Sequence, residues 1–380
     1  MSAHGVQAAC DAALRQQLLA RHGATFGAAD QAWRAWRLQD APALLQDHDV
    51  LLADGEAEPP VIARVAAAGA VLICSEREGG QWIDTVHSPM GTWVLGAGAD
   101  SDAPHGPGFV AVLLACLQMH FPAHDALCLA RAWRTGTLDW PDAFARFPQV
   151  RHPALAAPDQ LPPAFPPCPA LGLYAVVPDA DWIERLVALA VPTVQLRFKS
   201  NDVQAVQREV ERAALAARGS ASRLFINDHW RIAVAWHAAH GNDSARSGIY
   251  GIHLGQEDLD EADLYALRAS GLHLGVSTHG YAEMLRVATL RPSYLALGAI
   301  FPTTTKVMPT APQGLGRFQA YVRLMQPVVP SLVGIGGVDA ARLPQVLATG
   351  VGSAAVVRAI TEAADVPAAV ANLKGMFPAG

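Results

Sequence analysis

The chain has 380 residues, of which 51% are hydrophobic and 16% are charged, and its formal net charge is −6. This length allows two domains with sizeable cores, and an acidic balance without a long basic run argues against a nucleic-acid partner. The five cysteines are scattered and form no C-x-x-C pair, which argues against a disulfide framework or a zinc site. The sequence shows no signal-like start and no apolar run of membrane-spanning length, so we predict a soluble, cytoplasmic protein without a membrane partner.

Helical and strand-like segments alternate in the first half of the chain. Residues 1–48 are rich in Ala, Leu and Gln and are predicted to be helical, with Trp33 and Trp36 on one helix face. Two apolar strands, 49–53 and 70–74, flank a predicted helix over 60–69. This alternation indicates a small α/β domain.

A glycine turn, Pro104-His-Gly-Pro-Gly108, leads into an apolar helix, and a second helix is predicted over about 123–135. The free N–H groups of such a turn can bind an anion, although a capped buried helix shows the same pattern. The strand at 49–53, this turn and the Asp125-Ala126 helix resemble the hydroxymethylpyrimidine phosphate kinases of the ribokinase-like fold. The resemblance implies a degenerate kinase, because Phe109 stands where that family carries its reactive side chain and residues 1–48 lack its glycine-rich segment.

A proline-rich segment, residues 157–170, separates the two halves. Prolines remove backbone donors and favour extended backbone, so this segment is predicted to be a semi-rigid linker. The domains are therefore predicted at 1–156 and 171–380.

Eight strand-like runs, each followed by a helical pattern, fill the second half of the chain. They are Leu171–Val177, Thr193–Lys199, Arg223–Asn227, Ile249–Leu254, Leu272–Ser277, Tyr294–Ile300, Ser331–Ile335 and Ala354–Val357. Eight such units in about 210 residues predict a closed (β/α)8 TIM barrel. A doubly wound open sheet is the alternative, and the absence of a long insertion favours closure.

Polar side chains follow these strands where each strand ends, which is the catalytic face of such a barrel. In the second strand, Val194, Leu196 and Phe198 point one way, while Gln195, Arg197 and Lys199 point the other. Both faces of a parallel strand are normally covered, so this polar face predicts an anionic ligand.

Two kinds of anion site are predicted at this face. Asp228 and Asp258 follow adjacent strands and suit Mg²⁺ with a phosphate completing its shell. Lysine and arginine side chains at Arg197, Lys199 and Lys306 would hold a diphosphate beside that metal. The turn at Gly336 and Gly337, with the start of the last helix, is typical of a monophosphate site. The pattern indicates a substrate that loses pyrophosphate to a second, phosphorylated substrate.

Residues 171–375 resemble thiamine phosphate synthase. The matching motifs are Gln195-Leu-Arg-Phe-Lys199, Ile226-Asn-Asp228, His253-Leu-Gly-Gln-Glu-Asp258, Gly275-Val-Ser-Thr278, Thr303-Thr-Thr-Lys306, Gly314-Leu-Gly316 and Gly334-Ile-Gly-Gly337. The resemblance implies a transferase that joins 4-amino-2-methyl-5-hydroxymethylpyrimidine diphosphate to a thiazole phosphate, giving thiamine phosphate and pyrophosphate. Its cofactor would be Mg²⁺ and its partners the two small-molecule substrates.

The resemblance also implies a role for individual residues. Gln195 would bind the aminopyrimidine, and Asp228 and Asp258 would bind Mg²⁺. The diphosphate would be held by Arg197, Lys199, Asn227, Ser277 and Lys306, of which Arg197, Lys199, Ser277 and Lys306 are the predicted catalytic residues. The thiazole phosphate would be bound by Thr303, Thr305, Gly336, Gly337, Val357 and Arg358.

The sequence departs from the family pattern at one predicted site residue, and two other functions would fit the same barrel. Arg358 stands where the family commonly has a serine in its phosphate cup. A thiazole tautomerase or a non-catalytic thiamine-phosphate-binding protein would share the barrel. Neither needs the metal and diphosphate clamp that is retained here at Asp228, Asp258, Lys199 and Lys306. The sequence leaves open the oligomeric state and whether the thiazole is carboxylated.

Overall fold

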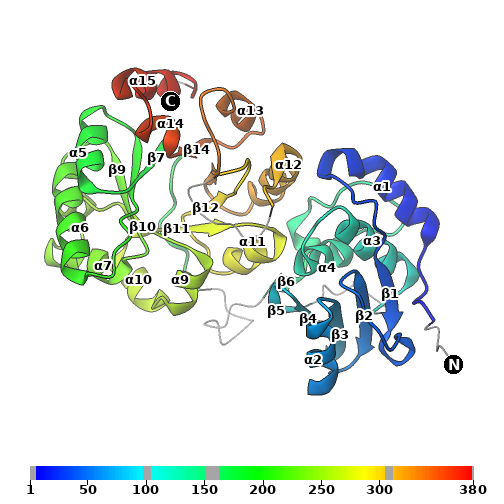
Figure 1. The fold of residues 1–380 in the computed structure, drawn as a ribbon. Helices are drawn as coiled ribbons and strands as arrows, with labels where there is room; N and C mark the ends of the chain where they lie inside the picture. The colour runs from blue at the N-terminus through cyan, green and yellow to red at the C-terminus, as the bar shows by residue number, and fades with distance from the viewer. Residues whose placement is uncertain (1–5, 97–103, 151–161, 304–310, 379–380) are drawn as a thin grey trace. The chain divides into compact units, whose positions relative to one another are not determined.

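The computed structural model describes residues 6–96, 104–150, 162–303 and 311–378 (Figure 1). The chain divides into two compact units. Unit 1 comprises residues 1–158 and 280–286, and unit 2 comprises 159–279 and 287–380.

Unit 2 contains a closed barrel of eight parallel strands. They are β7 (Gly172–Val177), β8 (Thr193–Leu196), β9 (Arg223–Asn227), β10 (Gly251–Leu254), β11 (His273–Thr278), β12 (Tyr294–Leu297), β13 (Leu332–Gly334) and β14 (Ser353–Val356). β14 pairs with β7 and closes the ring. The predicted barrel is therefore confirmed, and the open sheet is excluded.

Helices follow the strands and lie outside them, as α5, α6, α7 and α10 do in Figure 1. They are α5 (Ala180–Ala188), α6 (Val203–Ala217), α7 (Trp230–Ala239), α8 (Ser244–Ser247), α9 (Gln256–Glu261), α10 (Leu264–Ser270), α11 (Tyr281–Ala288), α12 (Gly314–Met325), α13 (Leu343–Leu347), α14 (Arg358–Thr361) and α15 (Val366–Gly375). Asp202 caps the N-terminus of α6, because its Oδ1 accepts the Gln204 N–H at 2.9 Å. Val206 and Val210 then bury its apolar face.

Aromatic rings fill the interior of the barrel. Tyr174, Phe225 and Tyr294 are fully buried, and the centroids of Phe225 and Tyr294 lie 5.2 Å apart. Gly275 makes room for them, since a Cβ there would stand 2.0 Å from Tyr294 Cζ. This packed layer closes the barrel below its mouth, where the polar strand ends gather.

The described part of the predicted linker, residues 162–170, packs against the barrel. Phe165 donates its N–H to the carbonyl oxygen of Arg291 at 3.0 Å, and Phe165 and Cys168 are buried. Apolar side chains within this proline-rich segment explain the packing, because their burial is favourable. Residues 157–161 lie outside the described residues.

Unit 1 contains a six-stranded mixed sheet. Its strands are β1 (Arg34–Arg37), β2 (Asp49–Asp54), β3 (Val71–Glu78), β4 (Gln81–Ser88), β5 (Gly91–Gly96) and β6 (Gln149–Val150). Its helices are α1 (Ala12–Phe26), α2 (Pro59–Ala67), α3 (Pro107–Gln118) and α4 (Ala123–Ala132), with short 3₁₀ turns at η1 (Leu38–Asp40) and η2 (Phe144–Arg146). β1 to β3 are parallel, whereas β4, β5 and β6 are antiparallel.

The prediction that residues 1–48 are helical is wrong beyond α1. Residues 34–37 form β1 instead, and Trp36 donates from Nε1 to Asp49 Oδ1 at 2.9 Å across the sheet. Pairing with the buried strand β2 outweighs the local Ala- and Leu-rich composition. The hairpin of β3 and β4 was not predicted, although Gly79 and Gly80, both at positive φ, form a typical two-residue turn.

Residues 280–286 belong to unit 1 by their contacts. Asp125, on α4, accepts the backbone N–H of Ala282 at 2.8 Å, and Trp140 donates from Nε1 to Tyr281 Oη at 2.8 Å. Burial raises the pKa of Asp125, against the opposing charge of His124. The first turn of α11 is thus capped by a buried carboxyl group.

A buried polar network ties the glycine turn of unit 1 to the sheet. Ser75 Oγ donates to Asp84 Oδ1 at 2.5 Å, and His105 Nε2 lies 2.9 Å from Ser75 Oγ. Arg131 donates two hydrogen bonds to Asp84, at 2.6 and 2.7 Å. Burial, then the charges of Arg131 and Arg37, lowers the pKa of His105 from 6.5 to about 4.

We expect this histidine to make unit 1 acid-sensitive. Because the native pKa lies below the unfolded one, the unfolded chain binds the extra proton between pH 6.5 and pH 4, so stability falls as the pH falls through this window. The loss should reach about 3 kcal/mol at pH 4. Hydrogen exchange of the α3 amides, measured against pH, reports it. His105→Gln should flatten that dependence, and identical pH profiles in the two proteins would contradict the assignment.

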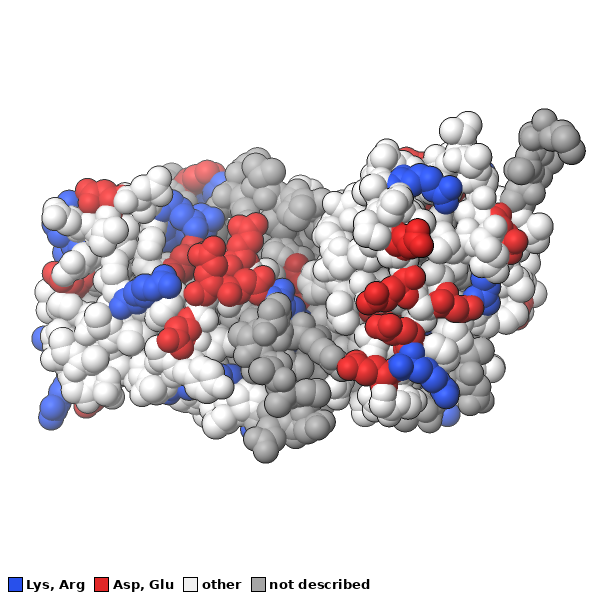
Figure 2. Space-filling model, turned by 90° about the horizontal axis from the view of Figure 1, so that it is seen from below, with Lys and Arg blue, Asp and Glu red and all other residues white. Residues whose placement is uncertain are grey.

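On the face shown in Figure 2, basic side chains are scattered and acidic ones form the larger groups. None of the helices in the described ranges combines the length and apolar character that a bilayer span requires.

Candidate active site

A cavity of about 500 Å³ opens at the C-terminal ends of the barrel strands. Every one of the eight strands, or the residues directly after it, contributes to its wall. The inward alternation of strand side chains and the polar residues after each strand together build this lining. Its volume suits a small-molecule substrate.

The predicted site residues that the structure describes all line this one cavity. They are Gln195, Arg197, Lys199, Asn227, Asp228, Asp258, Ser277, Thr303, Gly336, Gly337, Val357 and Arg358. Thr305 and Lys306 lie outside the described residues. The individual roles of these residues stay predictions.

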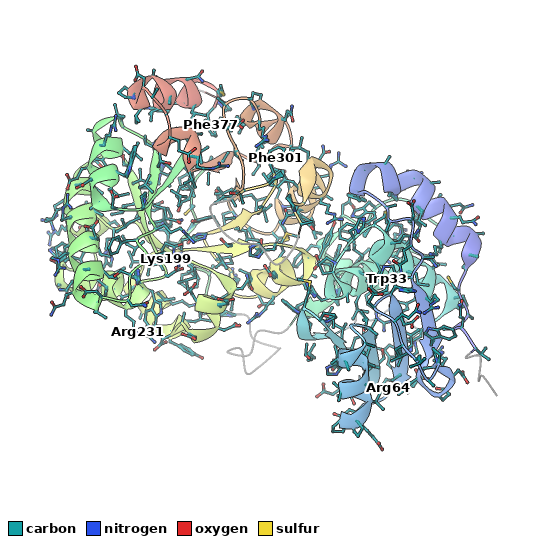
Figure 3. The ribbon with its side chains drawn as sticks, in the orientation of Figure 1. Trp33, Arg64, Lys199, Arg231, Phe301 and Phe377 are labelled. Carbon is teal, nitrogen blue, oxygen red and sulfur yellow. The ribbon has the colours of Figure 1, made fainter. Side chains whose placement is uncertain are left out.

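Asp228 stands at the junction of β9 and α7 in a left-handed backbone conformation, with φ of 62°. Asp tolerates this conformation better than most residues, yet it still costs free energy, and such strain gathers at functional sites. Lys199, labelled in Figure 3, donates from Nζ to Asp228 Oδ2. Burial alone would raise the pKa of Asp228, but the hydrogen bond and charge of Lys199 outweigh it and lower that pKa.

Asp258, in α9, shares a hydrogen bond with Asp228. Burial, followed by the negative charge of Asp228, raises the pKa of Asp258. Opposite shifts are typical of two carboxylates that compete for one proton. The pair would accept a divalent cation in place of that proton.

The turn after β13 brings backbone close to the cavity. Gly336 and Gly337 have φ of 98° and 65°. A Cβ on Gly336 would lie 2.5 Å from Ala299 Cβ, and one on Gly337 would lie 2.6 Å from the carbonyl oxygen of Pro302. Only glycine fits both the conformation and the space.

Two arginines of the cavity lining follow this turn in the sequence. Arg342 donates from Nη1 to the carbonyl oxygen of Gly337 at 2.8 Å, and its guanidinium lies 5.0 Å from the ring centroid of Phe301, which Figure 3 labels. Arg358 is exposed and begins α14. Arg342 therefore supports the turn, whereas the Arg358 side chain is exposed at the cavity rim.

Several lining residues escaped the sequence analysis. These are Glu257, Asp339, Arg342 and Glu362, together with His253, which begins one of the matching motifs but was given no role. Their positions in the sequence could have indicated them, because each lies within five residues of a predicted site residue. Tyr174 and Tyr294, which hydrogen bond below the cavity, looked like ordinary core residues.

Comparison with known proteins identifies the second half of the chain. A family model described as thiamine monophosphate synthase matches residues 173–360. The thiamine-phosphate synthase of Neisseria meningitidis serogroup B is 50% identical over 214 residues, which is 56% of this chain and 98% of that protein. The chain belongs to the thiamine-phosphate synthase family.

A second relative supports this assignment. The thiamine-phosphate synthase of Escherichia coli is 50% identical over 212 residues, covering 56% of this chain and 94% of that protein. A solved thiamine phosphate pyrophosphorylase from Pyrococcus furiosus is 22% identical, with a TM-score of 0.44, and covers 55% of this chain and 95% of that one. The predicted thiamine phosphate synthase and its transferase activity in thiamine biosynthesis are confirmed, and neither alternative activity is supported.

Proposed function

We propose that the cavity joins 4-amino-2-methyl-5-hydroxymethylpyrimidine diphosphate to a thiazole phosphate and releases thiamine phosphate and pyrophosphate. The proposal rests on one observation: two groups of residues that could bind anions line opposite sides of one cavity. Arg197, Lys199 and the carboxylate pair follow β8 to β10, whereas the glycine turn and Arg358 follow β13 and β14. In the closed strand order, β9 and β13 are four strands apart in either direction.

The diphosphate would bind between the ends of β8, β9 and β11. Arg197 and Lys199 supply charge there, and the Asn227 amide and the Ser277 hydroxyl supply neutral donors. Lys306 would add a third cation. Gln195, only 4% exposed, would fix the aminopyrimidine in the deeper part of the cavity.

Mg²⁺ fits the carboxylates of this site. Asp228 and Asp258 are hard oxygen donors. Burial, followed by the negative charge of Asp228, raises the pKa of Asp258, and a divalent cation would relieve the repulsion between the two carboxylates. In the described part of the chain, no three His, Cys, Asp or Glu side chains form a metal cage. The two aspartates would therefore hold the ion together with diphosphate oxygens and water, and the bound ion would neutralise charge on the leaving group.

The described lining supports the need for such a cation. It contains four Lys or Arg residues (Arg197, Lys199, Arg342 and Arg358) and five Asp or Glu residues (Asp228, Glu257, Asp258, Asp339 and Glu362). A lining with this balance would not hold both a diphosphate and a monophosphate by side-chain charge alone.

The reaction requires no covalent bond between the protein and either substrate. The bond between the pyrimidine methylene carbon and the diphosphate oxygen breaks, and its electron pair leaves with pyrophosphate. The electron-rich aminopyrimidine stabilises the methylene cation until the thiazole nitrogen donates its lone pair to form the new C–N bond. The protein's part is to stabilise the departing diphosphate, exclude water and align the nucleophile.

The thiazole phosphate would bind at the opposite wall. Backbone N–H groups of the Gly336 and Gly337 turn, the hydroxyls of Thr303 and Thr305, and the chain at Val357 would surround the phosphate. Arg358, in place of the family's usual serine, would add charge and a planar pair of donors.

Product analysis tests the proposed reaction. Protein with Mg²⁺ and both substrates should release pyrophosphate, and omission of either substrate should abolish thiamine phosphate formation. Isomerisation of a thiazole carboxylate without pyrophosphate release would instead indicate a tautomerase. Tight binding of thiamine phosphate without turnover would indicate a binding protein.

We also infer that residues 1–156 form a degenerate kinase-like domain followed by a connection to the barrel. Support comes from the parallel strands β1 to β3 and from α3, which begins after Gly106. At the glycine turn, the Arg131 guanidinium lies 4.3 Å from the Phe109 ring centroid and is engaged by Asp84. An apolar ring and a paired arginine would stand where a kinase needs a reactive side chain and a phosphate.

We therefore expect no kinase activity from this domain. Phe109 has no exchangeable proton, so it cannot activate a hydroxyl or stabilise a transferring phosphoryl group. The full chain, incubated with ATP, Mg²⁺ and the pyrimidine monophosphate, should form no diphosphate above a protein-free control. Catalytic accumulation of the diphosphate would show that the protein is bifunctional.

A further inference from the structure

A continuous chain of side-chain hydrogen bonds runs through the floor of the cavity. Gln195 donates from Nε2 to Tyr174 Oη at 2.9 Å, and Tyr174 Oη lies 2.8 Å from Tyr294 Oη. Tyr294 Oη lies 2.7 Å from His253 Nδ1, and His253 Nε2 lies 2.8 Å from Ser277 Oγ. This hydrogen-bond chain thus joins Gln195, the predicted pyrimidine-binding residue, to Ser277, a predicted diphosphate-binding residue.

Each member can hold only certain protons, so the bonds must run in one direction. A tyrosine hydroxyl has one hydrogen. Because Tyr174 accepts from Gln195, it donates to Tyr294, and Tyr294 donates to His253 Nδ1. His253 then carries its proton on Nε2 and donates to Ser277 Oγ. The hydroxyl hydrogen of Ser277 is left for a ligand oxygen in the cavity.

If the hydrogen bonds ran in the reverse direction, different atoms of Ser277 and Gln195 would face the cavity. Ser277 would then donate its hydroxyl hydrogen to His253. Gln195 would turn its amide so that Nε2, not Oε1, faced the cavity. Diphosphate oxygens only accept hydrogen bonds, so a bound diphosphate requires the Ser277 hydrogen and excludes the reverse direction. The ligand therefore favours the same direction that follows from Gln195 as the donor to Tyr174.

We propose that this chain of Gln195, Tyr174, Tyr294, His253 and Ser277 is a specificity device, in which diphosphate binding fixes Gln195 Oε1 toward the pyrimidine and so selects an amino group over an oxo group on that ring. The inference rests on the proposed function of the site. Gln195 Oε1 accepts from an amino group, whereas an oxo group would present a second acceptor and repel it. Tyr174, Tyr294 and His253 are positioning residues, since they act through the two ends of the chain.

The fold reserves space for this chain. Tyr174 and Tyr294 are at most 1% exposed, and Gln195 and His253 are 4% and 5% exposed. A Cβ on Gly275 would lie 2.4 Å from Tyr294 Oη, so glycine at this position admits the hydroxyl. Burial raises the pKa of both phenols, so both remain protonated donors. Solvent water has little access with which to reverse single links.

Substitution of Tyr294 is the most informative test, because Tyr294 links Tyr174 to His253. In Tyr294→Phe, Tyr174 loses its acceptor and can donate to Gln195 Oε1 instead, which lets Gln195 Nε2 face the cavity. Discrimination between the amino and oxo ligands should then fall about tenfold. Tyr250→Phe is the matched control, because Tyr250 packs against the same barrel core but lies outside the chain.

Binding without turnover isolates this effect. The probes are the monophosphate esters of the amino and oxo hydroxymethylpyrimidines, whose leaving groups are poor, titrated calorimetrically with Mg²⁺. Wild-type protein and Tyr250→Phe should prefer the amino ester, and Tyr294→Phe should lose most of that preference. An unchanged preference in folded Tyr294→Phe would overturn the proposal. If wild-type protein also made no thiamine phosphate, the proposed function itself would have failed.

A second measurement needs no variant. Long-range ¹H–¹⁵N spectra of wild-type protein with Mg²⁺ and pyrophosphate should show His253 protonated on Nε2 and unprotonated on Nδ1. Protonation on Nδ1 in that complex would mean that the chain runs the other way, and would overturn the proposal even if Tyr294→Phe failed to fold.

Discussion

Asp228→Ala and Asp258→Ala are each expected to reduce Mg²⁺-dependent synthesis of thiamine phosphate by about a thousandfold. The leaving diphosphate gains charge as its C–O bond breaks, and the two carboxylates would hold the cation that offsets this charge. Removing either aspartate leaves a single carboxylate for the cation. In Asp258→Ala that carboxylate is Asp228, which is already paired with Lys199. The measurement is steady-state pyrophosphate release over a range of Mg²⁺ concentrations.

A neighbouring carboxylate gives the control for these variants. Glu261 ends α9, the helix that carries Asp258, and lies outside the cavity lining. Glu261→Ala should therefore turn over normally. Near-normal rates in Asp228→Ala or Asp258→Ala at ordinary Mg²⁺ concentrations would remove that residue as a metal ligand.

Gly336→Ala is expected to raise the KM for the thiazole phosphate about a hundredfold. Its φ of 98° disfavours any side chain, and the added methyl group would stand 2.5 Å from Ala299 Cα and Cβ. The turn must move, and it carries the hydrogen bond from the Phe301 N–H to the Gly336 carbonyl oxygen at 3.0 Å. Loss of this geometry should weaken the phosphate contacts by about 3 kcal/mol, while the KM for the pyrimidine diphosphate changes little.

Gly350→Ala separates backbone strain from damage to the site. Gly350 has a similar φ of 89°, but its Cβ would meet no atom closer than 4.0 Å. This variant should lose stability without a change in either KM. If the two variants had the same kinetic effect, or if Gly336→Ala affected both substrates equally, the placement of the thiazole phosphate at this turn would be wrong.

Much of the barrel was readable from the sequence because its signals are local. Each strand is a short apolar run, each helix has its own hydrophobic period, and Asp202, directly before α6, is a residue type that commonly caps a helix. Polar residues such as Asn227 and Asp228 follow the strands directly, so the closed topology alone was enough to bring them to one cavity.

What the sequence did not reveal depends on partners far away in the chain. Trp36 lies in a strand because it pairs with β2 and bonds Asp49, which local composition does not encode. Tyr174 and Tyr294 are 120 residues apart and look like core aromatics until their hydroxyls are seen to meet. The direction of this hydrogen-bond chain follows from which of the facing atoms can donate, and no residue pattern predicts it.

The central claim is most directly tested by a single-turnover experiment on the full chain. Protein in excess over both substrates is mixed with Mg²⁺, quenched at intervals, and assayed for thiamine phosphate and pyrophosphate in the same samples. We predict that the two products appear together in equal amounts and that neither substrate alone gives thiamine phosphate. Thiamine phosphate formed without matching pyrophosphate, or no thiamine phosphate at all, would contradict the account.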